Sequence, residues 1–450
     1  MKPPSHFDID STDLLRQALE RLQSEYAGLP SVDRPTRDTK AIAEVLLEVA
    51  SRMGREFPYF HPLYAGQMLK PPHPVARLAY ALSMWINPNN HALDGGRASS
   101  VMEAEAVAQL ARLAGYSSHL GHLTSGGTMA NLEALWIAGQ LTNKSVILAS
   151  DQAHYTQGRI SAVLGLPFEP VASDRNGRLD MVELEKRLAK GDVGTVVATL
   201  GTTATGSVDP LPDILKLRSD YRFRLHVDAA YGGYFTLADN LESAARSAFD
   251  LMGAADSIVI DPHKHGLQPY GCGCVLFRDP AVGTLYKHDS PYTYFTSREL
   301  HLGEISLECS RPGAAAVALW ATQRLLPLEK GGTFGAGLTA GRSAAIALHR
   351  RMEADKRFVT PFAPELDILT WTVRAKSCSE ASTKSRRVFE AAARTGLHLA
   401  LAELPAAMFE HAGMLKDRAT VTSLRSVLMK PEHLAWEERI WRKIDEAMNA

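Results

Sequence analysis

Lys264 stands where its amine is able to react. It follows Ile-Asp-Pro-His at the end of an apolar, β-branched run, so it is predicted at the mouth of a sheet and not on a solvated helix face. An amine in such a place can form an imine with an aldehyde. Because a single lysine is far more often a surface or ion-paired residue, the hypothesis depends on the residues that accompany it.

Three other segments carry groups that suit a flat ring with a phosphate. Asp228 ends the run Arg-Leu-His-Val-Asp, and its carboxylate can keep a pyridine nitrogen protonated, which makes the ring an electron sink. His154, in Ser-Asp-Gln-Ala-His, can stack on the face of such a ring. The sequence Gly-Gly-Thr at 126–128 precedes a helix with apolar periodicity, and the N-terminus of a helix favours a phosphate.

Each of these signals also has an ordinary explanation: a turn aspartate, a hydrogen-bonded histidine or a simple helix cap. Their joint occurrence with an imine-forming lysine supports the functional interpretation. Together they predict a site for pyridoxal 5′-phosphate (PLP). No metal site is expected, since Cys272-Gly-Cys274 lacks the C-x-x-C spacing of zinc sites.

The candidate residues follow short β-branched runs that alternate with helical stretches from about residue 100 to 280, a pattern typical of an α/β domain built on a mainly parallel sheet. These runs are 145–150, 195–200, 224–230, 257–261 and 272–277. Polar or glycine-rich segments follow the first four. Because ligands bind beyond the carboxyl ends of strands in an open α/β sheet, the four segments are expected to converge on one site.

The pattern along the chain predicts three parts. Residues 1–90 hold two amphipathic helices, at about 11–28 and 39–54, and a loop at 57–74 that is rich in proline and aromatic residues. The large α/β domain, with the cofactor site, is expected over 91–330. A long helix at 337–353, a strand at 367–375 and further helices predict a smaller α+β domain over 331–450.

Composition points to an ordinary globular protein. The chain has 450 residues, 45% of them hydrophobic, and 49 Lys and Arg against 50 Asp and Glu, so neither a nucleic-acid surface nor a membrane span is implied. The first residues contain no apolar targeting segment, and a cytoplasmic location is expected. The four cysteines are too few for a disulfide scaffold, and all are expected to be buried.

Several segments of the chain resemble the group II PLP-dependent amino-acid decarboxylases, which share the fold-type-I aminotransferase architecture. They are SGGTMAN (125–131), DQAH (151–154), LGTTATGSVD (200–209), HVDAAYGG (226–233) and DPHKHG (261–266). The resemblance runs from about residue 55 to 330. It implies a fold-type-I enzyme, a PLP cofactor, and decarboxylation of an L-amino acid to its amine and CO₂. It also implies a homodimer, because such enzymes usually build each site from two subunits.

Carried over residue by residue, the resemblance implies a role for each motif. Lys264 would form the Schiff base with PLP, Asp228 would pair with the pyridine nitrogen, and His154 would stack above the ring and could act as a general acid. The other expected cofactor contacts are Gly127, Thr128, Thr203, Ala230 and His263.

The resemblance also implies residues on the substrate side. Arg311 matches a family arginine that would bind the substrate carboxylate or the phosphate, and a tyrosine in the loop after the lysine would protonate the product. Tyr292 and Tyr294 are both candidates for that tyrosine. Tyr64, with its aromatic neighbours, could face an aromatic substrate, whereas Arg374 or His61 could meet an acidic one.

The chain departs from the family pattern beside the lysine. Many animal and plant aromatic decarboxylases read Asn-Pro-His-Lys-Trp, whereas Asp261 and His265 flank this motif here, as in archaeal tyrosine/aspartate decarboxylases and in sphingosine-phosphate lyase. Carbon–carbon lysis is therefore an alternative to decarboxylation, with transamination a third candidate. A PLP-binding protein with a regulatory or structural role is the alternative outside enzymes.

Overall fold

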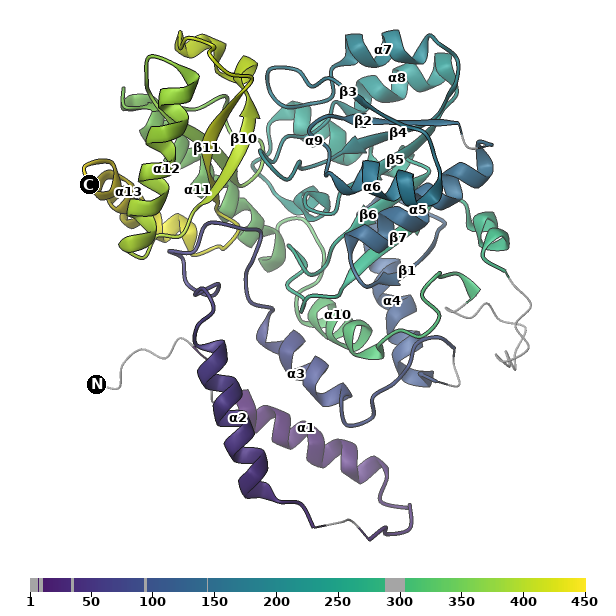
Figure 1. Ribbon diagram of the computed structural model, residues 1–450. Coiled ribbons are helices and arrows are strands. Elements are labelled where there is room, and N and C mark those ends of the chain that lie inside the picture. The colour runs from purple at the N-terminus through teal and green to yellow at the C-terminus, as the bar shows by residue number, and fades with distance from the viewer. Residues whose placement is uncertain (1–6, 8–10, 34–35, 93–94, 144, 288–303) are drawn as a thin grey trace.

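The computed structural model describes residues 7, 11–33, 36–92, 95–143, 145–287 and 304–450. Figure 1 shows three parts: an N-terminal helical segment below, a large sheet-containing body, and a C-terminal portion with a second sheet beside it. The two sheets lie on opposite sides of residue 330 in the sequence. We propose residues 90 and 330 as the boundaries between the parts.

The large sheet has seven strands in the order β1-β7-β6-β5-β4-β2-β3. Their bounds are β1 Leu120–Thr124, β2 Val146–Ser150, β3 Phe168–Val171, β4 Val193–Thr199, β5 Arg224–Asp228, β6 Ser257–Ile260 and β7 Gly273–Phe277. Strands β6, β5, β4, β2 and β3 are parallel, and β7 runs antiparallel to both of its neighbours. This confirms the mainly parallel α/β sheet expected from the sequence.

Helices cover both faces of this sheet (Figure 1). They are α4 Arg97–Leu113, α5 Gly127–Leu141, α6 Thr156–Leu164, α7 Met181–Leu188, α8 Leu211–Tyr221, α9 Ser243–Asp250 and α10 Gly313–Leu325. Every residue of β2, β6 and β7 is buried, as two-sided covering requires. Side chains alternate between the faces: Ile258 and Ile260 join the core beneath α4, whereas Val259 packs with α5.

The C-terminal part is built on a four-stranded antiparallel sheet in the order β10-β11-β9-β8. The strands are β8 Phe358–Val359, β9 Ile368–Val373, β10 Ala400–Pro405 and β11 Thr420–Val427, and the helices are α11 Thr333–Ala354, α12 Cys378–Arg394 and α13 His433–Met448. These elements share a separate core centred on Trp371, which is fully buried. The arrangement is the smaller α+β unit that the sequence predicts.

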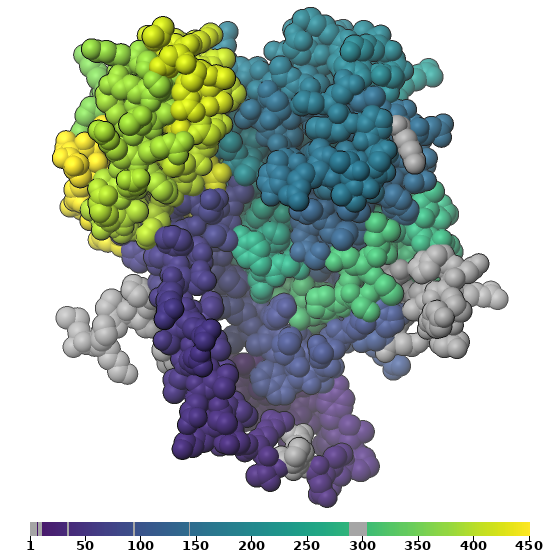
Figure 2. All heavy atoms as spheres, in the orientation of Figure 1, coloured from purple at the N-terminus to yellow at the C-terminus, as the bar shows by residue number. Residues whose placement is uncertain are grey.

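Three helices form the N-terminal segment: α1 Ser11–Glu25, α2 Thr39–Met53 and α3 Pro74–Ser83. The start of α2 is capped by Asp38, whose carboxylate accepts a hydrogen bond of 2.9 Å from the backbone N–H of Ala41. Figure 2 shows the α1–α2 pair projecting from the body. No residue of α2 is buried in the monomer.

The expected elements are present with ends shifted by a few residues, but the sequence patterns missed α3, both edge strands of the large sheet, β1 and β3, and the strands β8, β10 and β11 of the small sheet. Only helices were expected after residue 375. Edge strands are short and carry weak patterns: β1 contains a glycine, and β3 contains Pro170, which an edge tolerates. One further expectation is wrong. Cys309 is exposed, because it lies before α10 in a segment without regular structure. No described helix is long and apolar enough to span a membrane.

Backbone contact between two strand-end loops leads to a first prediction. A Cβ at Gly232, in the turn after β5, would lie 2.1 Å from the backbone oxygen of Leu200, which follows β4. Because a backbone atom cannot move aside cheaply, we expect Gly232→Ala to lower the free energy of unfolding by about 1–3 kcal/mol.

Urea unfolding followed by circular dichroism measures this change. Gly28→Ala is the control, because nothing lies within 4 Å of a Cβ built there. An unchanged unfolding midpoint for Gly232→Ala would contradict the packing described.

Candidate active site

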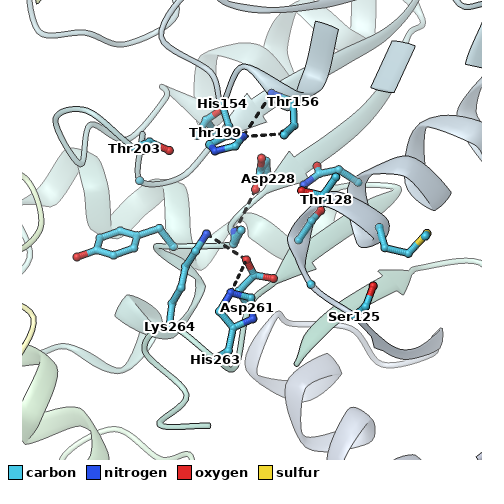
Figure 3. Close-up of a pocket in the computed structure, with 17 residues that line it drawn as sticks. Ser125, Thr128, His154, Thr156, Thr199, Thr203, Asp228, Asp261, His263 and Lys264 are labelled. Carbon is cyan, nitrogen blue, oxygen red and sulfur yellow. Dashed lines mark hydrogen bonds and ion pairs between the residues drawn. The ribbon is translucent and has the colours of Figure 1, made fainter. Parts of the chain in front are cut away.

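The four strand-end segments meet at one cavity of about 270 Å³, at the carboxyl ends of the parallel strands (Figure 3). The sheet order places β2, β4, β5 and β6 side by side, so the segments that follow them are neighbours in space. Every cofactor contact predicted from the sequence lines this cavity: Gly127, Thr128, His154, Thr203, Ala230, Asp228, His263 and Lys264.

Lys264 reaches the cavity from the turn after β6. Its Nζ lies 3.0 Å from Oδ2 of Asp261, and its side chain is 20% exposed. Asp261 is buried, and Nε2 of His263 lies 3.6 Å from the same Oδ2. The other carboxylate oxygen, Oδ1, has no hydrogen-bond partner in the described part of the chain. Asp261 was not singled out from the sequence as a site residue, although it stands in the lysine motif. It supplies a counter-charge for the amine.

Asp228, the last residue of β5, is fixed by two donors. Its Oδ2 accepts a hydrogen bond of 2.8 Å from the side-chain amide of Gln157, and its Oδ1 accepts one of 3.1 Å from the backbone N–H of Ala230. Buried carboxylates are costly unless hydrogen bonds compensate them. The two donors therefore stabilise the charge and set the direction of the carboxylate.

A second layer of contacts fixes Gln157 in turn. Its amide also donates to Oδ1 of Asn131 at 3.0 Å, and Nε2 of His226 lies 2.9 Å from the same oxygen. Burial lowers the pKa of His226 to about 4, so the ring is neutral and donates through Nε2. Sequence reasoning missed both Gln157 and Asn131. The available signal was position: Gln157 follows His154 by three residues, and Asn131 ends the SGGTMAN motif.

His154 lies on one side of the Asp228 carboxylate and Lys264 lies on the other (Figure 3). Nδ1 of His154 is 2.7 Å from the hydroxyl of Thr156 and accepts the backbone N–H of Thr156 at 3.3 Å. Burial lowers the pKa of His154, an effect larger than the opposing one of Asp228. A neutral ring that accepts at Nδ1 carries its proton on Nε2.

The start of α5 forms the third wall. Gly126 adopts φ +151° and caps the helix without a side-chain hydrogen bond, so the first N–H groups of α5 are left for another acceptor. A Cβ at Gly127 would lie 2.6 Å from Oδ2 of Asp261, so any larger residue there would have to displace the carboxylate that faces Lys264. The hydroxyl of Thr199, which lines the cavity, is buried and without a hydrogen-bond partner among the described residues.

These features fit PLP. The cavity offers an amine for its aldehyde, a carboxylate for its pyridine nitrogen, a histidine ring beside that carboxylate, and a helix N-terminus for its phosphate. Residues 126–372 match the family model described as the pyridoxal-dependent decarboxylase conserved domain, which is more than half of the chain. The chain belongs to the pyridoxal-dependent decarboxylase family. It is therefore a PLP-dependent carboxy-lyase that acts on an amino acid.

Named relatives agree with this family. An L-tyrosine decarboxylase of Enterococcus faecium is 27% identical, covering 80% of this chain and 77% of its own. An L-aspartate decarboxylase of Thermococcus kodakarensis is 30% identical over 62% of this chain and 71% of its own. The fold matches the crystal structure of Oryza sativa TDC with PLP and tryptamine, with a TM-score of 0.76 and 18% identity over 99% of this chain and all of the other.

Two residues expected on the substrate side are not brought to the cavity of this decarboxylase. Arg311 is buried against α4, where its guanidinium lies 2.7 Å from Glu103, and that ion pair accounts for its charge. Tyr64 is buried too, and its ring faces the ammonium of Lys430, 5.3 Å from the ring centre. Burial and local partners hold both side chains elsewhere. Tyr292 and Tyr294 lie outside the described residues.

Tyr231, another residue of the cavity wall, links the site to the C-terminal part. Its hydroxyl donates to Oδ1 of Asp367 at 2.6 Å, just before β9, and Nε2 of His265 lies 3.3 Å from Oδ2 of the same carboxylate. Burial raises the pKa of Asp367 to about 6. The ring of His265 packs edge-on against Tyr231 and Phe235. The histidine after Lys264 therefore packs at the junction between the two sheets.

The hydrogen bonds to Asp228 lead to a second prediction. Gln157→Leu removes the side-chain donor to Oδ2 of Asp228 and leaves a side chain of similar size. Hydrogen bonds to charged groups contribute about 1.5–3 kcal/mol, so we expect the dissociation constant of PLP to rise about 10- to 100-fold.

Absorbance titration of the apoenzyme with PLP measures this constant. Gln152→Leu, in the turn before α6 and without a contact to Asp228, is the control. Equal PLP affinity in the Gln157→Leu and wild-type proteins would show that Gln157 does not hold the carboxylate in a productive direction.

Proposed function

We propose that this decarboxylase converts an aromatic L-amino acid to its amine and CO₂, with Lys264 as the residue that binds PLP. The observation that supports it best is the convergence of Lys264, Asp228 and His154 with the N-terminus of α5 on one cavity. Bound PLP supplies an electron sink for the bond that breaks at the substrate Cα. The protein contributes the positions of the charges and protons around it.

Each polar side chain has a distinct task in this proposal. Asp228 keeps a proton on the pyridine nitrogen, with its carboxylate directed by Gln157 and Ala230. Asp261 balances the charge of the Lys264 amine when that amine is free. His154, which carries a proton on Nε2, covers the ring. The proton that replaces CO₂ comes from His154 or from Tyr292 or Tyr294.

The remaining predicted contacts complete the cofactor site. Gly127 and Thr128 receive the phosphate at the start of α5, with His263 nearby. Ala230 provides a flat, small surface against the ring, and Thr203 lies beside it. Arg311 and Tyr64 do not line the cavity, and their proposed role is structural: Arg311 pairs with Glu103, and the ring of Tyr64 packs against Lys430.

The choice of a substrate without a second carboxylate rests on charge. Among the described residues that line the cavity, Lys264 is the only lysine or arginine. A second carboxylate on the substrate, as in aspartate, would therefore lack a cationic partner there. The relative from Enterococcus faecium is named an L-tyrosine decarboxylase, which agrees with this preference. We propose L-tyrosine as the first substrate to assay.

A direct prediction follows for Lys264. Reduction of the holoenzyme with borohydride is expected to leave pyridoxyl mass on the peptide that contains Lys264, and carboxyl-labelled L-tyrosine is expected to release ¹³CO₂. Lys264→Ala should lose both signals, because no other described amine lines the cavity.

Lys190→Ala, at an exposed lysine, is the control and should keep both signals. An adduct on Lys264 with no label released from any amino acid would direct the search to carbon–carbon lysis or transamination. Pyridoxyl mass on a different residue would refute the assignment of Lys264.

We propose that the enzyme works as a homodimer in the cytoplasm. One face of α2 carries apolar side chains that are 48–61% exposed in the monomer: Ile42, Val45, Leu46, Val49 and Met53. Such a continuous apolar face favours a protein partner. A second copy of this chain is the partner expected for this fold. The proposed location is supported by the four free cysteines, which agree with a reducing compartment such as the cytoplasm. The balanced charge favours neither nucleic acid nor an anionic membrane as a partner.

The α2 face gives a prediction for the assembly. The double variant Leu46→Glu with Val49→Glu places charges in the centre of this face, where burial without a partner is costly. We expect light scattering after size exclusion to show a dimer for the wild type and a monomer for the variant.

Leu47→Glu is the matched control, because Leu47 is 71% exposed on the opposite side of the same helix. It should remain dimeric. A double variant that keeps the mass of a dimer would show that this face is not part of the interface.

A further inference from the structure

A groove in the C-terminal part concentrates basic side chains away from the active site. It has a volume of about 670 Å³ and lies between α12, the end of α13 and the β8–β9 edge of the small sheet. Figure 1 shows α12 and α13 at the outer margin of the molecule, on the side away from α5 and α6. Glu390 and Ala450, the last residue of the sequence, line the groove together with six cations: Lys356, Arg357, Arg374, Lys384, Arg387 and Arg394.

Four of these cations lack a carboxylate partner. Within the described ranges, Lys356, Arg387 and Arg394 make no hydrogen bond or ion pair through their side chains. Arg374 donates only to backbone carbonyls, with Nε 2.9 Å from the oxygen of Lys356. By contrast, Arg357 pairs with two aspartates and Lys384 with Glu380, so these two are already neutralised.

The concentration of charge is a local feature. The whole chain is balanced, with 49 basic and 50 acidic residues. Arg386, next to Arg387 on α12 but outside the groove, is paired with Glu403 at 3.0 Å. Like charges that face one another across a hollow repel, and this repulsion is relieved when an anion enters. The guanidinium groups favour phosphate, which they bind through two parallel hydrogen bonds.

The floor of the groove is apolar. The apolar residues that line it are Val373, Val388, Ala391, Ala447 and Met448, and all of them except Met448 are buried. A simple inorganic anion would leave this floor empty. The combination suits a ligand with several phosphates at one end and a flat or apolar body at the other, and the volume lies in the range of small-molecule sites.

We propose that this groove binds a nucleoside triphosphate. Arg387, Arg394 and Arg374 hold the phosphates at the rim, with Lys356 beside them, and the base and sugar cover the apolar floor. The proposal is independent of the reaction at Lys264, because no residue lines both the groove and the active-site cavity.

ATP is the probe, and the protein is the full chain saturated with PLP, so that the phosphate site at α5 is filled. Calorimetric titration should show one ATP site per chain. The double variant Arg387→Gln with Arg394→Gln should weaken ATP binding at least about 100-fold, if each arginine contributes about 10-fold through a charge-assisted contact.

The double variant Arg386→Gln with Arg442→Gln removes the same charge from exposed residues outside the groove and should bind ATP like the wild type. Tripolyphosphate should bind more weakly than ATP, because it leaves the floor uncovered. A photoreactive azido-ATP should label peptides from α12 or from the end of α13, a readout that does not depend on any variant folding.

Three results with ATP or its azido analogue would overturn the proposal. They are no ATP binding by the wild type, equal ATP affinity in the two double variants, or labelling confined to peptides outside the groove. Tripolyphosphate affinity equal to that of ATP would also overturn it, since that result shows a phosphate-binding surface without a nucleotide site.

Discussion

The buried carboxylate of Asp228 is the constraint on which the site depends. A charge at the end of a covered strand is costly unless donors compensate it. Gln157 and the backbone of Ala230 supply those donors, and Oδ1 of Asn131 accepts hydrogen bonds from both Gln157 and His226. The network joins α5, α6 and β5. The direction of one carboxylate is thereby fixed by several elements of the large sheet.

The parallel sheet brings the reactive groups together. Strands β2, β4, β5 and β6 are adjacent and point the same way, so the loops that follow them meet at one edge. Lys264, Asp228 and His154 are far apart in the sequence, yet Asp228 ends a strand of this edge and the other two follow their strands by only a few residues. The hydrogen bond from Tyr231 to Asp367, with the ring of His265 packed beside Tyr231, then joins this edge to the C-terminal sheet.

The sequence predicted the parts of the site that depend on strand order and on motif residues. It could not predict Gln157 or Asn131 as site residues, because their role arises from hydrogen bonds between segments. Arg311 illustrates the opposite case: its motif was recognised, but burial beside Glu103 decides where its charge is used. Strands β1 and β3 were missed because a glycine and a histidine in β1 and a proline in β3 interrupt their apolar runs.

The pyridine nitrogen of PLP offers the most direct test of the central claim, that Asp228 holds the cofactor in its protonated form. The measurement is the ¹⁵N chemical shift of labelled PLP in the reconstituted wild-type protein and in Asp228→Asn. The account predicts a protonated nitrogen in the wild type and an unprotonated one in the variant. The same chemical shift in both proteins would contradict it.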